Sequence, residues 1–204
     1  MIYITILLAY FLGSIPSAVW LGKYFYGVDV REHGSGNAGA TNVFRTLGKN
    51  AGIPVLILDM LKGFAAVNLS WLTDLPPGSE GWTSLRVVLA LVSIIGHIFP
   101  VFANFRGGKG VATMTGTLIA LNPVAALIAV VIFFLVFMLT HYISLSSITT
   151  ALLLPVVFGA WLHGGISLSL FSLAVAAIII ITHRKNIQRL MKGEESKMKL
   201  FGKK

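Results

Sequence analysis

The sequence contains no cysteine among its 204 residues. This absence excludes a disulfide framework, a thiolate nucleophile and any cysteine-ligated metal or iron–sulfur centre. Charge is scarce too, since Asp, Glu, Lys and Arg make up 11% of the chain, against about 25% in a soluble domain. Hydrophobic residues make up 56% and the mean hydropathy is +0.85. Lipid must therefore surround most of the surface, which excludes a disordered chain, a coiled coil and a cytosolic enzyme.

Long apolar runs take the place of the missing charge. A membrane-spanning helix needs about 20 mainly apolar residues. Seven segments approach this requirement, at approximately 2–21, 52–73, 86–104, 111–121, 124–141, 146–163 and 166–182. The sequence therefore predicts an all-α, polytopic membrane protein with about seven transmembrane helices, folded as a single domain over 1–204. Because the segment 111–121 is short, five or six full crossings stay open.

The few charges are unevenly placed, and the net charge is +9. Bases occur in the connection 22–51, in the third connection at Arg106 and Lys109, and in the tail 183–204, whereas the alternate connections lack them. The positive-inside rule then places the amino terminus outside and the tail in the cytoplasm. We expect the tail to be an amphipathic or partly frayed helix that contacts anionic lipid headgroups. This distribution points to membrane lipid, and not nucleic acid, as the partner of the basic residues.

The first polar cluster runs from Gly34 to Asn42 and is followed by Arg45. Glycine lets backbone amides turn toward a ligand, and small hydroxyl and amide side chains add donors. The candidate binding residues in this cluster are Ser35, Gly36, Asn37, Thr41 and Asn42. A short helix over Thr41–Leu47 would place Arg45 near an anion held at the loop. The alternative is an ordinary polar loop, but long loops in compact proteins are usually functional or disordered.

The second cluster is the glycine-rich turn around Lys109, formed by Gly107, Gly108 and Gly110 at the start of a predicted helix. Free N–H groups, the positive end of the helix dipole and an ammonium group would converge there on an oxyanion. A tight turn with basic anchors is an equally good interpretation. The turn is not a Walker A loop, because that motif needs a glycine five residues before Gly108 and Ser or Thr after the lysine.

The third cluster begins the tail, where His183 and Asn186 are three residues apart and share a helix face. Ser144 lies at the fifth connection and either adds a hydroxyl donor or caps a helix. The three clusters lie in, or next to, the connections and the tail that carry bases, or in a connection on the same side of the membrane. The positive-inside rule therefore places all of them at the cytoplasmic surface. They predict a phosphate-binding pocket there, which fits an enzyme or a transporter of a phosphorylated substrate, whereas a non-catalytic scaffold leaves the glycine-rich loops unexplained.

Three ionisable residues lie in the interior of predicted spans, where each costs about 2.5–3.5 kcal/mol. Asp59 and Lys62 are three residues apart and can pair, and His97 lies in the next span. We interpret the pair as structural, holding the Gly34–Asn42 loop in place. For His97 a hydrogen-bonded packing role is at least as good as a chemical one.

The three polar clusters and the segments around Asp59, Lys62 and His97 follow one another in a characteristic order. In this order, which extends along nearly the whole chain, the sequence resembles the bacterial acyl-phosphate:glycerol-3-phosphate acyltransferases. The resemblance implies a seven-helix enzyme of the bacterial inner membrane with its active site on the cytoplasmic side. It implies acyl transfer from acyl phosphate to the sn-1 hydroxyl of glycerol 3-phosphate, giving lysophosphatidic acid and phosphate in phospholipid synthesis. No histidine is followed five residues later by aspartate, so the HxxxxD pattern of other glycerophosphate acyltransferases is missing.

The resemblance also assigns roles to the clusters. Arg45, Lys109, His183 and Asn186 are the expected catalytic residues, and Ser35 to Asn37, Thr41, Asn42, Gly107, Gly108, Gly110 and Ser144 the expected substrate-binding ones. His183 acts either as a general base or as a positioning group, with a phosphate oxygen of the donor taking the proton in the second case. We expect no cofactor and no metal. The soluble enzyme that makes acyl phosphate is a possible partner.

Overall fold

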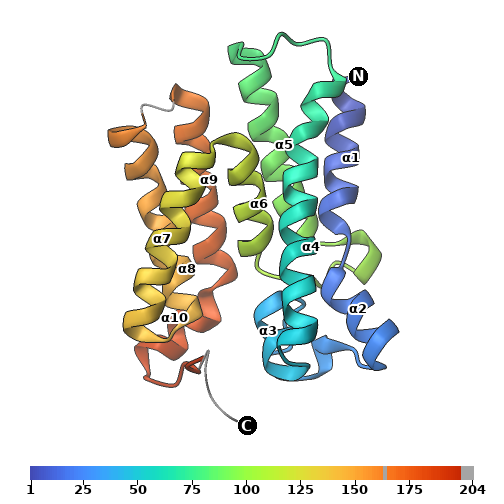
Figure 1. The fold of residues 1–204 in the computed structure, drawn as a ribbon, viewed down its shortest axis with the longest axis vertical. Coiled ribbons are helices and arrows are strands. Elements are labelled where there is room, and N and C mark those ends of the chain that lie inside the picture. The colour runs from blue at the N-terminus through green and yellow to red at the C-terminus, as the bar shows by residue number, and fades with distance from the viewer. Residues whose placement is uncertain (163–164, 199–204) are drawn as a thin grey trace. The chain divides into compact units, whose positions relative to one another are not determined.

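The computed structural model describes residues 1–162 and 165–198, and every regular element in these ranges is a helix (Figure 1). The all-α prediction is therefore confirmed. The chain divides into two compact units, one from Met1 to Pro123 and the other from Val124 onward. Each unit is described by itself below.

The first unit contains six α-helices and three short 3-10 turns. The helices are α1 (Ile2–Ser14), α2 (Ser17–Tyr26), α3 (Ala40–Thr46), α4 (Lys49–Asn68), α5 (Glu80–Ile98) and α6 (Val111–Leu121), and the turns are Val30–Glu32, Leu69–Leu72 and Val101–Ala103. Helix α4 is central, packing against α1, α3, α5 and α6 (Figure 1). Helix α5 is capped by Ser79, the residue before it, whose side chain accepts a hydrogen bond of 3.1 Å from the Trp82 N–H, a standard N-cap.

The first predicted span, 2–21, is two helices and not one. Helix α1 ends at Ser14, α2 begins at Ser17, and the two axes are bent by 42°. Pro16 is the physical cause, because its ring removes a backbone N–H and prevents a continuous hydrogen-bond ladder. The Val19 N–H donates to the Pro16 carbonyl at 2.9 Å and starts the second helix.

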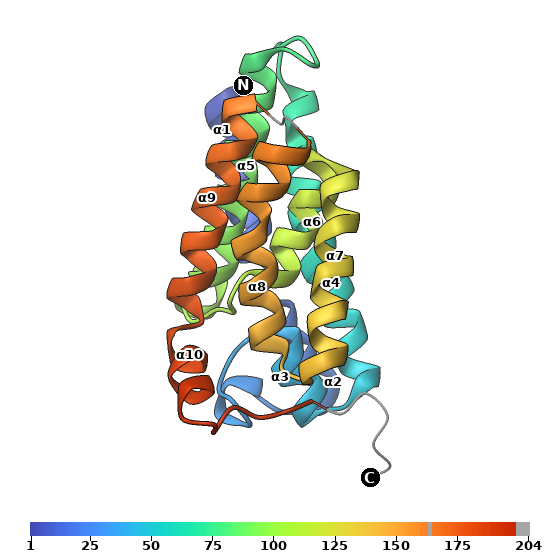
Figure 2. The same cartoon turned by 90° about the vertical axis from the view of Figure 1, so that its left-hand side faces the viewer.

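The second unit contains α7 (Pro123–Thr140), α8 (Ile143–Val156), α9 (Gly165–Thr182) and α10 (Arg184–Met191), and α8 continues as a π-helical turn over Val157–Trp161. Helix α10 is the helical part of the predicted basic tail. After it the chain runs back along the ends of α8 and α7 (Figure 2), and the Met198 N–H donates to the His141 carbonyl at 2.9 Å. The last bases of the tail, Lys199, Lys203 and Lys204, lie outside the described residues, as do His163 and Gly164.

All seven predicted apolar segments coincide with helices. Five continuous helical segments are long and apolar enough to cross a membrane, and the bent pair α1/α2 makes a sixth. Helix α6 has only 11 residues and falls short of the roughly 20 that a full crossing needs. The structure thus supports a multi-pass membrane protein, while seven crossings and the orientation of the termini stay predictions.

Glycines let the helices of the first unit approach closely, as small residues do in membrane proteins. A side chain at Gly13 of α1 would overlap the Ser93 carbonyl oxygen of α5, and one at Gly63 of α4 would overlap the Thr113 carbonyl oxygen of α6. Gly116 of α6 lies in the same way against the Met60 carbonyl of α4. These contacts interlock α1 with α5 and α4 with α6.

Gly116→Ala should therefore destabilise the protein. The new Cβ would meet a backbone atom that cannot rotate away, so α4 and α6 must separate, at a cost of about 1–3 kcal/mol. We expect a lower midpoint of thermal unfolding in detergent. Gly81→Ala in α5 is the matched control, because its Cβ meets only the Leu75 side chain at 3.8 Å. Equal midpoints for the two variants would contradict the close approach.

Candidate active site

Asn42 shapes the Gly34–Asn42 loop from inside. Its side chain is 1% exposed, and its Nδ2 donates to the carbonyl oxygens of Val30 at 2.7 Å and His33 at 3.1 Å. Its Oδ1 accepts the Ser35 N–H at 2.8 Å. Asn42 was predicted to bind substrate, but its amide is used within the loop, so its role is to hold the loop in shape. Sequence reasoning could not separate this buried asparagine from its exposed neighbours.

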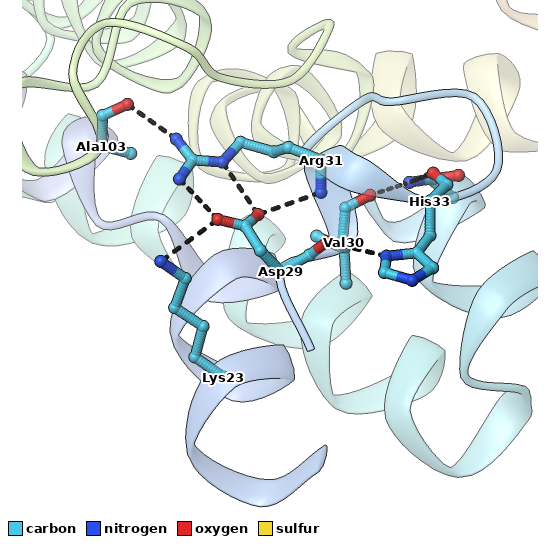
Figure 3. A network of polar contacts seen from close by, with 7 residues as sticks. Lys23, Asp29, Val30, Arg31, His33 and Ala103 are labelled. Atoms are coloured by element: carbon cyan, nitrogen blue, oxygen red, sulfur yellow. Dashed lines mark hydrogen bonds and ion pairs between the residues drawn. The ribbon is translucent and has the colours of Figure 1, made fainter. Parts of the chain in front are cut away.

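Asp29 and Arg31 connect this loop to the segment before the glycine–lysine turn (Figure 3). Arg31 donates two hydrogen bonds to the Asp29 carboxylate, from Nε at 3.0 Å and from Nη2 at 2.7 Å. Its Nη1 donates to the Ala103 carbonyl at 2.9 Å. Lys23 adds an ion pair to Asp29 at 3.2 Å. The hydrogen bonds from Arg31 hold the pKa of Asp29 well below its usual range. The pair is therefore charged at neutral pH and fixes two segments that lie far apart in the sequence.

The glycine–lysine turn is anchored on the end of α5. The Gly107 N–H donates to the Ile98 carbonyl and the Gly108 N–H to the His97 carbonyl, both at 3.2 Å. This differs from the expectation that these amides face a ligand. Helix α6 starts directly after Gly110, whose φ of +88° favours glycine. The half-buried Lys109 and the first turn of α6 lie directly beside these two amides in the chain, and they are the parts of the turn that suit an oxyanion.

The amides of the first loop are used in the same way. The Gly36 N–H donates to the His33 carbonyl at 3.1 Å, and the Ser35 N–H donates to Oδ1 of Asn42. Ser35 and Gly36 are themselves exposed, and Asn37 is half-buried. The Ser35 side chain is thus the part of this loop best placed to meet a ligand.

Helix α3 carries Arg45, as the predicted helix over Thr41–Leu47 required. The helix packs through Val43, which is fully buried, and a side chain at Gly52 of α4 would overlap the Phe44 ring. Thr41 is half-buried in the first turn of α3, and Arg45 is exposed in its last turn. The packing of α3 on α4 therefore fixes the backbone that carries this exposed arginine.

In the second unit, the carboxylate of Glu195 binds two of the predicted site residues, Ser144 and Asn186. Its Oε1 accepts hydrogen bonds from Ser144 Oγ at 2.7 Å and from Asn186 Nδ2 at 2.6 Å, and its Oε2 accepts Arg189 Nε at 2.7 Å. Burial alone would raise the pKa of Glu195, but these hydrogen bonds outweigh it and leave the pKa below its usual value. Sequence reasoning missed Glu195, and the one available signal was an acidic residue in a basic tail.

His183 lies at the break between α9 and α10 and is 2% exposed. Its Nδ1 is 2.9 Å from the Ile179 carbonyl oxygen. Because a carbonyl only accepts, Nδ1 must carry the hydrogen in this contact. In the neutral form of the ring, Nε2 is then the nitrogen that carries the lone pair and acts as the acceptor.

The structure therefore assembles the predicted site residues in two groups. The first unit joins the Gly34–Asn42 loop to the glycine–lysine turn, and the second joins Ser144 to Asn186, with His183 one turn earlier. The meeting of the two groups in one pocket stays a prediction. Within residues 1–162 and 165–198, no three His, Asp or Glu side chains form a group that could hold a metal ion.

Comparison with known proteins gives one consistent result. A family model described as glycerol-3-phosphate acyltransferase matches residues 3–193. The chain is similar to the glycerol-3-phosphate acyltransferase of Fusobacterium nucleatum, with 47% identity over 95% of this chain and 96% of that protein. The enzyme of the same description from Staphylococcus carnosus is 44% identical over 98% of both.

Two solved structures are also similar. One is the crystal structure of PlsY (YgiH), an integral membrane glycerol 3-phosphate acyltransferase, in its glycerol 3-phosphate form. It has a TM-score of 0.88 and 35% identity, over 97% of this chain and 96% of that one. The lysophosphatidic acid form of PlsY has a TM-score of 0.85 and 34% identity, over 97% and 95%.

Proposed function

The chain belongs to the glycerol-3-phosphate acyltransferase family, and from this premise we propose that it uses acyl phosphate to acylate the sn-1 hydroxyl of glycerol 3-phosphate. The products are lysophosphatidic acid and inorganic phosphate. One observation carries the proposal: Arg31 ties together two segments that each present a base, Arg45 on one and Lys109 on the other. Two positively charged side chains on linked segments can bind the phosphate groups of two reactants at the same time.

In this reaction the main task of the enzyme is to hold the two reactants together in the correct orientation. Acyl phosphate is a mixed anhydride with a good leaving group, so no covalent enzyme intermediate is required. The hydroxyl oxygen attacks the carbonyl carbon, the bond from that carbon to the phosphate oxygen breaks, and phosphate leaves with the electron pair. Arg45 and Lys109 would offset the repulsion between the two reactants and stabilise the charge on the departing phosphate.

His183 is proposed to hold the acceptor hydroxyl, with its Nε2 accepting a hydrogen bond. Its Nδ1 is oriented by a backbone carbonyl and not by a carboxylate, which favours positioning over general-base catalysis. The hydroxyl proton then passes to a phosphate oxygen of the donor. Asn186 and Ser144, both bonded to Glu195, complete this second group of residues in the proposed pocket.

The choice of donor and the location are part of the proposal. The chain has no HxxxxD motif, which argues against the donors used by other glycerophosphate acyltransferases. We place the enzyme in the bacterial inner membrane with seven crossings, its amino terminus outside and its site at the cytoplasmic surface. The bases of the first and third connections and of the tail support this orientation.

The test is a donor comparison with the purified protein in detergent. With acyl phosphate and labelled glycerol 3-phosphate, we expect lysophosphatidic acid and phosphate in equal amounts, with the acyl group on the sn-1 oxygen. Acyl-CoA and acyl carrier protein should give no product. Product from acyl-CoA alone would overturn the donor assignment. Uptake of glycerol 3-phosphate into proteoliposomes without any product would favour the rival function, a transporter.

A further inference from the structure

A buried charged cluster lies behind the glycine–lysine turn, in the membrane-spanning part of the first unit. It consists of Asp59 and Lys62 on α4 and His97 on α5, which are 1%, 6% and 5% exposed. The proposed chemistry uses none of the three. Each is costly in an apolar environment, and a buried ion pair is often no more stabilising than the apolar residues that could replace it. Stability alone is therefore a weak reason for the cluster.

On one side the cluster fixes the break between α1 and α2. Lys62 Nζ lies 2.9 Å from Asp59 Oδ1 and donates to the Ile15 carbonyl at 2.7 Å. At this break the Ile15 carbonyl has left the regular helical ladder, because the Val19 N–H donates to Pro16 and the Ser17 N–H donates to Ile15 at 3.1 Å. The ammonium group adds a second, charged donor to this carbonyl.

On the other side the cluster supports the turn. His97 Nδ1 lies 3.6 Å from Asp59 Oδ1, so this edge of the ring faces the carboxylate. The opposite edge lies against Gly108, where an added Cβ would overlap Nε2. The His97 carbonyl also accepts the Gly108 N–H. The backbone that carries Lys109 thus rests on the imidazole, and the carboxylate lies behind that imidazole.

We propose that Asp59, His97 and Lys62 are positioning residues for Lys109. The Asp59 carboxylate joins the Lys62 ammonium to the His97 ring, and the ring supports Gly108, so that the ammonium of Lys109 is held where a phosphate group of a substrate binds. The inference rests on the proposed function, in which Lys109 binds phosphate. A displacement of about 1 Å in such a group can cost 10²-fold in rate.

Asp59→Asn and His97→Gln test the proposal through Lys109 itself. Each variant should raise the KM for a phosphorylated substrate at least tenfold while the purified protein keeps its helical content. Because the effect passes through Lys109, neither change should add to the loss already caused by Lys109→Ala, so the double-mutant cycle is strongly non-additive. Ser93→Ala is the control, since Ser93 is fully buried on α5 and bonds only the Ala90 carbonyl in its own helix.

A spin label gives a second measurement that does not depend on activity. The chain has no cysteine, so Arg106→Cys, an exposed position in the turn, takes a single nitroxide. Asp59→Asn and His97→Gln should make this label more mobile, and Ser93→Ala should not. If Asp59→Asn does not fold, His97→Gln decides alone, because it leaves the Asp59–Lys62 pair intact.

The outcomes separate the two proposals. An inactive wild-type protein would refute the proposed function, whatever the label shows. An active wild type whose Asp59 and His97 variants keep the KM and the label mobility of the control would overturn the positioning role. Losses that add fully to that of Lys109→Ala would also overturn it, because the residues would then act independently of the lysine.

Discussion

Lys109→Ala and Arg45→Ala are each expected to lower kcat/KM for lysophosphatidic acid formation by about 10²–10³-fold, or roughly 2.7–4 kcal/mol. The reason is electrostatic: each change removes a fixed positive charge from the proposed site, in which two phosphorylated reactants would lie side by side. The measurement is a steady-state assay in which both substrates are varied. Arg45→Lys should recover part of the loss, since it keeps the charge but not the planar fork of the guanidinium group.

Matched controls separate the site from the general charge of the surface. Arg106→Ala removes an exposed base three residues before Lys109, and Lys49→Ala removes an exposed base four residues after Arg45. Both should stay within about threefold of the wild type, because surface charges act weakly at a distance. Losses as large as those of the site variants would show that the activity follows net charge and not a pocket.

The fold was largely predictable because apolar length is a local property. Each of the seven apolar segments is helical, the first as the bent pair α1 and α2, and the short helix over 41–47 appears as Ala40–Thr46. The break at Pro16 was available in the sequence, but the apolar run on both sides concealed it. The number of crossings was less accessible, because hydropathy does not tell a short helix such as α6 from a full span.

The proposed site was easier to predict from the sequence as a set of segments than as a set of residue roles. Glycine-rich stretches next to bases pointed to two segments that the structure links through Arg31, but whether an amide faces a ligand depends on partners far away in the chain. Arg31 meets Ala103 across 72 positions, and Ser144 meets Glu195 across 51. No local pattern encodes such pairs, and so Asp29 and Glu195 were missed while Asn42 was given a ligand-binding role.

Glu195→Gln should release the end of the chain and inactivate the enzyme. Glu195 is 8% exposed, and its carboxylate accepts three hydrogen bonds, which join α8 and α10 to the segment after α10. A neutral amide has one acceptor oxygen in place of two and turns an N–H toward a donor. Hydrogen bonds to a charged group contribute about 1.5–3 kcal/mol each, so we expect a clearly lower unfolding midpoint at pH 7, faster tryptic cleavage after Lys192 and at least tenfold lower activity.

The pH dependence of this variant distinguishes a charge effect from a packing effect. Hydrogen bonds hold the pKa of Glu195 below its usual value in the folded state. The stabilisation is therefore complete above the unfolded-state pKa, about 4.3, and is lost as the pH falls through the folded-state pKa. The difference in unfolding midpoint between wild type and Glu195→Gln should shrink on acidification below about pH 4. Glu194→Gln, at the exposed neighbouring position, should match the wild type throughout. A difference that is constant with pH would mean that the shape of the glutamate side chain, and not its charge, holds the segment in place.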